Sequence, residues 1–310
     1  MRYLIELSGD DGGADVREFI AEWIETPALR KLVELEGGSW PSGGLKERVE
    51  ALHRFSERWD FRGGVERLEI DTSEGAPETE QILAAGAELG LTLAEPPRNE
   101  SYDHALVLGG TVLASIYRLR RLYELRDSGT GMDHIAVLTA LREVSDAELE
   151  LVAERAEIAG LAKGVRTEFD AMTAATAAFG HGQAEVEHKP NRNPHLASAL
   201  ARVGDALVLA APSGDPGRRA NTRDNYDVYS RQIEPGASIL IVTSSIYLPY
   251  QFFIALQALG WEQPRQIEAV GFPPEWMAGV LTGPLNVLQE IRSALFGALN
   301  TLRALGNEGG

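Results

Sequence analysis

The chain contains no cysteine among its 310 residues. It therefore has no disulfide framework, no thiolate nucleophile and no cysteine-ligated zinc or iron–sulfur site. Basic residues are also scarce, with 29 Lys and Arg against 46 Asp and Glu, which gives a formal net charge of −17. This charge repels a nucleic-acid backbone, so nucleic acid is not an expected partner.

Several functional signatures are absent as well. The six histidines show no His-x-x-x-His spacing and there is no Gly-x-Ser-x-Gly elbow, so neither a histidine metal site nor a serine hydrolase is predicted. The first ten residues do not resemble a signal peptide. The uncharged run 236–261 is interrupted by Thr243, Ser244, Ser245 and Pro249, which favours a buried strand over a membrane span. We therefore expect a cytoplasmic protein with no membrane partner.

The N-terminal third has helical patterns. Apolar residues recur at a spacing near 3.6 over residues 16–35, 45–59 and 78–89, while residues 3–5 indicate a short strand. The polar, Pro-rich segment 95–100 marks a boundary. We predict a mainly helical region over 1–97, an α/β domain over 98–275, and an amphipathic C-terminal helix and tail over 276–310.

The middle of the chain alternates strands with helices. Strands are predicted at 104–108, 135–138, 206–210 and 239–242, and helices up to residue 125, over 146–157 and over 167–179. Alternation of this kind predicts a Rossmann-like open parallel sheet flanked by helices. The polar segment 181–195 is predicted to be a loop, either a lid over a site or a solvated connection.

Polar residues at strand ends are the candidate ligand-binding groups. Gly109, Gly110 and Thr111 lie between a strand and a helix, where backbone N–H groups can approach an anion or simply form a tight turn. Arg118 is the best-placed cation for a phosphate or carboxylate, unless it is a surface arginine. Thr243 and Ser244 end the last predicted strand.

A second group of candidates lies on two other helices. Asn221, Thr222 and Asn225 project together from a helix start, where they bind a ligand or merely cap the helix. Glu168 is the best candidate for a general acid or base. Asp170 lies two residues further along, so the two carboxylates point in different directions.

Taken in order, these motifs resemble the bacterial family that includes YdcF, SanA and ElyC. The family pattern is a strand ending in Leu-Gly-Gly, a helical arginine, a Ser-Glu-Ala-like helix start, Asn-Thr-x-Glu-Asn, and Val-Thr-Ser-x-Tyr-His-Met-Pro-Arg. The corresponding residues here are 107–110, Arg118, 167–169, 221–225 and 242–250. The agreement covers about residues 101–275. Tyr247 and Tyr250 stand where the family has a histidine and an arginine.

The resemblance implies a Rossmann-like sheet and a ligand such as S-adenosylmethionine, which one family member binds. The loss of a histidine and an arginine implies a changed ligand or none, and either tyrosine would donate a hydrogen bond or stack on a ring. We predict a small-molecule binding protein for a nucleotide-type, S-adenosylmethionine-like or anionic metabolite, with Glu168 and Asn225 catalytic if it is a transferase or hydrolase. Tyr247 would close the pocket.

The alternative is a non-catalytic regulatory or scaffold protein that acts through protein partners. In this hypothesis the N-terminal helices and the C-terminal apolar stripe make the contacts, including those of a homo-oligomer. The substrate, the reaction and the oligomeric state are not encoded in any motif that we identify.

Overall fold

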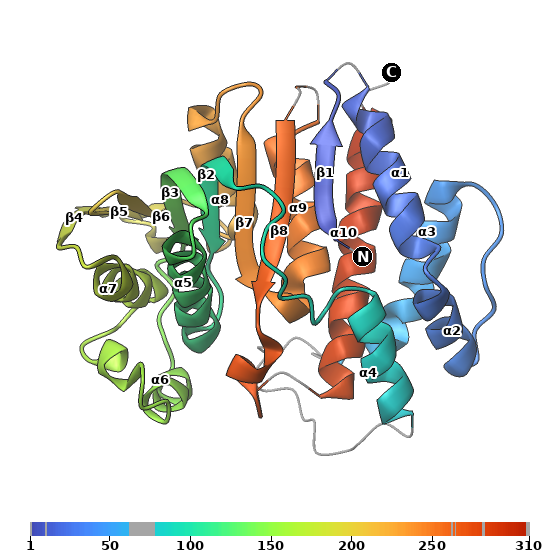
Figure 1. Cartoon of the computed structure of the whole chain (residues 1–310), viewed down its shortest axis with the longest axis horizontal. Helices are drawn as coiled ribbons and strands as arrows, with labels where there is room; N and C mark the ends of the chain where they lie inside the picture. The colour runs from blue at the N-terminus through green and yellow to red at the C-terminus, as the bar shows by residue number, and fades with distance from the viewer. Residues whose placement is uncertain are drawn as a thin grey trace. The chain divides into compact units, whose positions relative to one another are not determined.

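The computed structural model describes residues 2–9, 11–61, 78–261, 263, 265–280 and 283–307. Contacts divide the chain into two compact units (Figure 1). Unit 1 joins Met1–Glu95 to Ser245–Gly310, and unit 2 is the continuous stretch Pro96–Ser244. The chain leaves unit 1 at the Pro-rich segment that marks the predicted boundary. It returns at Ser245, whereas the sequence analysis places residues 245–275 in the α/β domain.

The return to unit 1 is explained by strand pairing. Strand β1 (Tyr3–Leu7) pairs antiparallel with β8 (Arg265–Phe272), and Tyr3 lies opposite Ala269. Helix α9 (Leu248–Leu259) leads into β8 and packs on α10 (Pro284–Asn307). The sequence analysis does not predict β8, because the strand begins with polar residues.

The N-terminal helices of unit 1 are shorter than their periodic patterns. The structure has α1 (Gly12–Ile24), α2 (Pro27–Leu35), α3 (Leu45–Phe55), the 3-10 turn η1 (Ser56–Trp59) and α4 (Thr79–Glu88). A continuous helix over 16–35 is therefore wrong. Proline has no N–H to donate to a preceding turn and is favoured at the first helical position, so Pro27 begins a second helix.

Aromatic side chains form the core of unit 1. Trp23 Nε1 donates a hydrogen bond to Tyr3 Oη over 2.9 Å, and Tyr3 donates in turn to the carbonyl of Leu89. The Tyr3 ring meets Phe252 edge-on, and the Trp23 ring meets Phe253 edge-on, with a centroid distance of 5.5 Å in each pair. These contacts join β1, α1 and α9, although the three elements are far apart in the sequence.

Unit 2 is built around four parallel strands. They are β2 (Ser101–Leu108), β3 (Gly131–Thr139), β6 (Ala206–Ala210) and β7 (Ser238–Ser244), in the order β7-β2-β3-β6. The predicted α/β fold is confirmed. Counted along the chain, the strands lie in the order 4-1-2-3, which is the arrangement of a Rossmann half with the next strand added beside the first. The strand order reverses between β2 and β7.

Helices connect these strands. They are α5 (Val112–Asp127), α6 (Asp146–Ala153), α7 (Glu168–Gly180) and α8 (Thr222–Tyr229). Helix α5 packs on α7 and β7, and α8 packs on β3. Because parallel crossovers are right-handed, α5 and α7 cover one face of the sheet and α8 covers the other. Helix α6 ends at Ala153, four residues before its predicted end.

Two antiparallel strands extend the sheet beyond β6. Strand β5 (Ser198–Val203) pairs with β6, and β4 (Ala184–Lys189) pairs with β5. A continuous loop over 181–195 is therefore wrong. Every residue of β4 is exposed, so the strand lacks the apolar face by which strands are recognised in a sequence.

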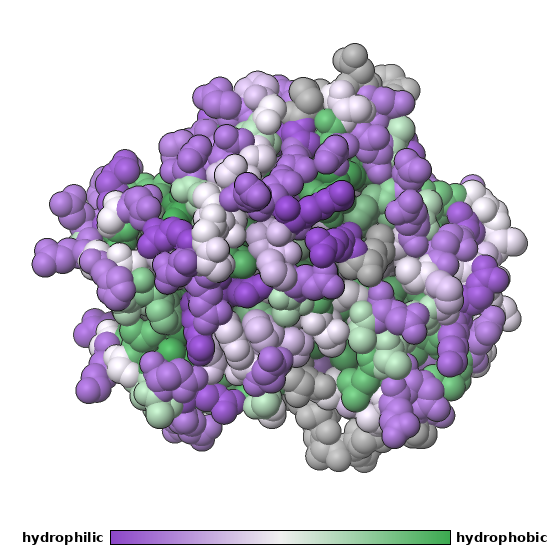
Figure 2. All heavy atoms as spheres, viewed as in Figure 1, coloured by the Kyte–Doolittle hydropathy of each residue, from purple (hydrophilic) through white to green (hydrophobic). Residues whose placement is uncertain are grey.

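The uncharged run 236–261 does not form one long helix. It contains β7, the turn η6 (Ser245–Tyr247) and α9. Among the described residues, no helix has the length and apolar composition that a membrane crossing requires. Figure 2 shows hydrophilic residues over most of one face of the protein, as the high charge of the chain leads one to expect.

Candidate functional site

The carboxyl edge of the unit 2 sheet carries the candidate site. The Gly109-Gly110-Thr111 turn follows β2, and Thr139 and Ser244 end the two strands that pair with β2. In open α/β sheets, ligands bind outside the carboxyl ends of the strands where the strand order reverses. In this protein that place lies between β2 and β7.

The glycine turn is packed tightly. Gly109 donates its N–H to the carbonyl of Leu138 over 2.7 Å. A Cβ atom at Gly109 would overlap Glu168 Oε1, and one at Gly110 would lie 3.1 Å from an Arg118 nitrogen. The two glycines are therefore needed for a close approach of side chains to the backbone, in addition to forming a turn.

Glu168 lies under this turn at the first position of α7, and its side chain is buried. Oε1 accepts a hydrogen bond from Thr139 Oγ1 at 3.0 Å, and Oε2 accepts one from Arg142 Nε at 3.3 Å. Burial raises the pKa of Glu168, although the charge of Arg142 and the two hydrogen bonds act in the opposite direction. The carboxyl group is thus able to hold a proton at a higher pH than an ordinary glutamate.

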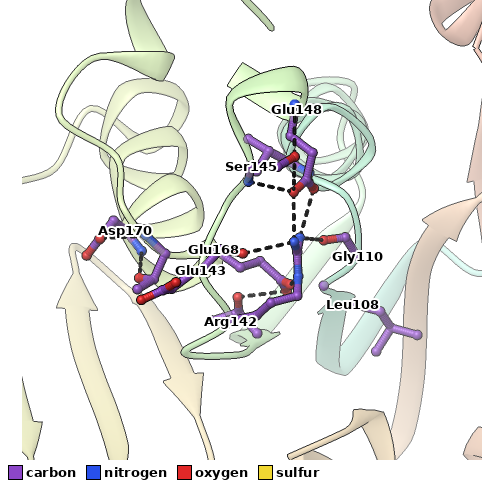
Figure 3. A network of polar contacts seen from close by, with 12 residues as sticks. Leu108, Gly110, Arg142, Glu143, Ser145, Glu148, Glu168 and Asp170 are labelled. Carbon is purple, nitrogen blue, oxygen red and sulfur yellow. Dashed lines mark hydrogen bonds and ion pairs between the residues drawn. The ribbon is translucent and has the colours of Figure 1, made fainter. Parts of the chain in front are cut away.

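Arg142 connects Glu168 to a second buried carboxylate (Figure 3). Its terminal nitrogens bind both oxygens of Glu148, at 2.7 and 2.9 Å, and Nη2 also donates to the carbonyl of Gly110 at 2.9 Å. Glu148 Oε1 accepts the N–H of Val112 at the start of α5. Burial alone would raise the pKa of Glu148, but the hydrogen bonds and charge of Arg142 lower it overall. An internal carboxylate therefore occupies the N-terminal end of α5, where an anionic ligand was expected.

Arg142 and Glu148 are not among the site residues that the sequence predicts. One local signal was present, since Ser145 and Glu148 form a capping box at the start of α6. That pattern predicts the helix start alone. The pairing of Glu148 with Arg142 and Val112 depends on the tertiary structure.

Arg118 is buried and is not a surface arginine. It donates to Ser244 Oγ at 3.0 Å and to the carbonyl of Leu108 at 2.7 Å, and it also donates to the carbonyl of Gly109. Its guanidinium group therefore joins the ends of β2 and β7. It supplies a positive charge at the point where the strand order reverses.

Asn221 caps helix α8. Its side chain accepts from the N–H groups of Arg223 and Asp224, and the Asp224 carboxylate accepts the N–H of Asn221. The capping alternative for this residue is thus what the structure shows. Thr222 is the first residue of α8 and is half-buried.

Asn225 lies at the carboxyl edge and is buried. Its amide nitrogen donates to the carbonyl of Thr139 at 2.9 Å, and its oxygen accepts the N–H of Ala211 at 2.9 Å. The side chain therefore joins the ends of β3 and β6 and satisfies backbone groups that would otherwise be unpaired.

Strand β7 ends at Ser244, which is the last residue of unit 2. Thr243 is buried and its hydroxyl has no hydrogen-bond partner among the described residues, while Ser244 accepts from Arg118. Tyr247 belongs to unit 1, where it is buried in the turn before α9, and Tyr250 lies on α9 in the same unit. The structure thus brings Gly109, Gly110, Arg118, Glu168 and Ser244 together within unit 2.

Asp170 does not form a catalytic pair with Glu168. Asp170 accepts the N–H groups of Arg166 and Thr167 in the capping box of α7 and does not share a partner with Glu168. In the part of the chain that the structure describes, no group of three or more His, Asp or Glu residues is suited to a metal ion. The site offers the Glu168 carboxyl group, which can hold a proton and accepts hydrogen bonds from the Thr139 hydroxyl and the Arg142 guanidinium.

Comparisons with known proteins give relatives over almost the full length. Residues 8–90 match the family described as the Rv3785 N-terminal domain. Rv3785 of Mycobacterium tuberculosis H37Rv and Mb3814 of Mycobacterium bovis are each 30% identical over 326 residues, which cover 93% of this chain and 89% of the relative. Both relatives are described as uncharacterised proteins. No solved structure matches.

Proposed function

This chain belongs to the protein family of Rv3785, and we propose that it binds a small molecule with an anionic group at the carboxyl edge of unit 2. The observation that carries this proposal is the reversal of strand order between β2 and β7, with Gly109 and Arg118 beside it. Sheets of this kind bind ligands at that place. Arg118 would attract an anionic group to it.

Glu168 is the group that we assign to proton transfer if the protein is an enzyme. Its raised pKa brings it nearer to neutral pH, where a general acid and base is most effective. Thr139 and Arg142 hold the carboxyl group in one orientation. Asn225 acts as a positioning residue, because its contacts fix the ends of β3 and β6.

A thermal-shift screen with nucleotides, S-adenosylmethionine and sugar phosphates tests the proposal. A ligand at 100 times its Kd stabilises a protein by about 2.7 kcal/mol, so a binder raises the midpoint clearly. The shift should shrink in Arg118→Gln, which removes the cation assigned to the anionic group, and persist in Glu150→Gln, which changes an exposed glutamate of α6. A ligand that shifts wild-type and Arg118→Gln equally would contradict the role of Arg118.

A second candidate function is a scaffold that acts through protein partners. It is favoured by the way Arg118, Arg142 and Asn225 direct their donors to groups of their own chain. This function predicts no midpoint shift with any of the ligands and a stable oligomer or complex through the helices of unit 1. Sedimentation velocity measures that directly.

The resemblance of residues 101–275 to YdcF, SanA and ElyC stays a prediction, as does S-adenosylmethionine as a ligand. The matched family region covers residues 8–90, which is a different part of the chain.

A further inference from the structure

A second group of loops lies at the carboxyl edge of the unit 2 sheet, beside β5 and β6 and away from β2 and β7. Strand β6 ends at Ala210, which pairs with Ala199 near the start of β5, and Ser198 pairs with Lys189 at the end of β4. The loop 190–197 and the loop 211–221 therefore leave the sheet at the same edge. We call these two loops, together with the first turn of α8, the basic clasp.

The basic clasp carries the opposite charge to the rest of the chain. Residues 190–197 and 211–225 contain four arginines and two aspartates, in a protein with 46 acidic and 29 basic residues. Arg192, Arg219 and Arg223 are exposed, and Arg218 is half-buried. Arg218 pairs with Asp224, and Arg223 lies 3.9 Å from Asp227. A local positive field in an acidic protein attracts anions to one place.

Hydrogen bonds join the two loops. Asn193 Nδ2 donates to the carbonyl of Pro216 at 3.0 Å, and the N–H of Ser213 donates to the carbonyl of His195 at 2.8 Å. Asn193 also accepts the N–H of His195 within its own loop. These hydrogen bonds hold the backbones of the two loops at a fixed separation. Less conformational entropy is therefore lost when the arginines on both loops bind a ligand.

The loop 211–221 is held by its own Asp215 and by Asp224 of α8. Asp224 is buried, binds both terminal nitrogens of Arg218 and accepts the N–H of Gly214. Asp215 accepts the N–H of Gly217. Carboxylates thus occupy these glycine N–H groups, and an incoming anion meets guanidinium groups in preference to the backbone of this loop.

We propose that the basic clasp binds small molecules that carry two or more linked phosphate groups. Guanidinium groups form paired hydrogen bonds with phosphate, and several arginines suit a ligand with several negative charges. A short ligand is favoured over nucleic acid, because the acidic remainder of the chain repels a long polyanion. The proposal stands apart from the proposed function, since it concerns the ends of β5 and β6 and not the place between β2 and β7.

Isothermal titration calorimetry of the full chain with inorganic pyrophosphate and with orthophosphate tests the proposal. We expect pyrophosphate to bind more tightly than orthophosphate, and its affinity to fall as NaCl rises from about 50 to about 300 mM. Arg192→Ala with Arg219→Ala should weaken pyrophosphate binding at least about tenfold, since one charged hydrogen bond accounts for about that factor. The pyrophosphate affinity of Arg192→Lys with Arg219→Lys should lie between those of wild-type and the double alanine variant. Lysine keeps the positive charge but cannot form the paired hydrogen bonds of a guanidinium group.

Arg231→Ala is the matched control, because it removes an exposed arginine beyond the opposite end of α8. It should leave the affinity unchanged. No detectable binding of pyrophosphate, an equal loss in Arg231→Ala, or an unchanged affinity in the double alanine variant would each overturn the proposal. If the alanine variant does not fold by circular dichroism, the lysine variant decides by the same comparison. Arg118→Gln should keep pyrophosphate affinity, which separates this site from the place between β2 and β7.

Discussion

At the scale of the residue, the glycine turn after β2 leaves no space for a side chain. A Cβ at Gly109 would overlap Glu168 Oε1 and lie 3.0 Å from the carbonyl of Leu138. The Leu138 oxygen belongs to the backbone, and the Glu168 side chain is held by Thr139 and Arg142. Neither atom can therefore move aside easily. The backbone or the network must therefore move to accept any other residue.

Gly109→Ala should lower the free energy of unfolding by about 1–3 kcal/mol, the usual cost of inserting atoms into a packed interior. Urea denaturation followed by circular dichroism measures it. Gly160→Ala is the control, since nothing lies within 4 Å of a Cβ at Gly160. Equal stability of the two variants would show that the turn accepts a methyl group.

The pKa of Glu168 predicts how stability depends on pH. Burial raises this pKa in the folded state, so the folded protein binds this proton more tightly than the unfolded chain. The contribution of Glu168 is therefore most favourable below the ordinary glutamate pKa and is lost as pH rises through the raised value. Glu168→Gln should remove that part of the pH dependence. Urea unfolding midpoints between pH 5 and pH 8 measure this dependence. If the midpoint changes with pH by the same amount in wild-type and Glu168→Gln, the raised pKa of Glu168 is contradicted.

At the scale of the element, helix α8 depends on its N-cap residue, Asn221. The Asn221 side chain accepts two N–H groups that have no partner within the helix, and α8 has only 8 residues over which to recover such a loss. The start of α8 also places Asn225 against the ends of β3 and β6.

Asn221→Ala should lower the free energy of unfolding by about 1 kcal/mol, and Asn221→Ser should restore most of it, because serine also caps helices. Hydrogen exchange of residues 222–229 should accelerate in the alanine variant alone. Equal exchange in both variants would show that the packing of α8 on β3 holds the helix without its cap.

Element types were more predictable from the sequence than the contacts of the site. The four parallel strands are apolar runs, so β2, β3, β6 and β7 are predicted, and the structure places Glu168 and Asn225 against Thr139 at the end of β3. Strand β4 was missed because it is exposed on both faces. The partners of Arg118 and Arg142 come from distant segments, and local spacing carries no information about them.

At the scale of the whole molecule, the net charge of −17 acts against the folded state. Like charges repel more strongly in a compact chain than in an expanded one, and salt screens the repulsion. Adding NaCl from about 10 to about 150 mM at pH 7.5 should therefore raise the thermal midpoint. The same addition near the isoelectric point of about 4.8 should change it little. Differential scanning calorimetry at both pH values measures this, and a midpoint that falls with salt at pH 7.5 would contradict it.

The path of the chain between the two units sets the order in which they can be completed during synthesis. Unit 2 ends at Ser244, so all of its strands are synthesised before α9 and β8. Tyr3 is synthesised before all of unit 2, yet its strand partner Ala269 is synthesised after it. Domains usually fold in the order of their synthesis, with the N-terminal one first. Here the N-terminal strand must wait, and the unit that begins at Pro96 is the first to be complete.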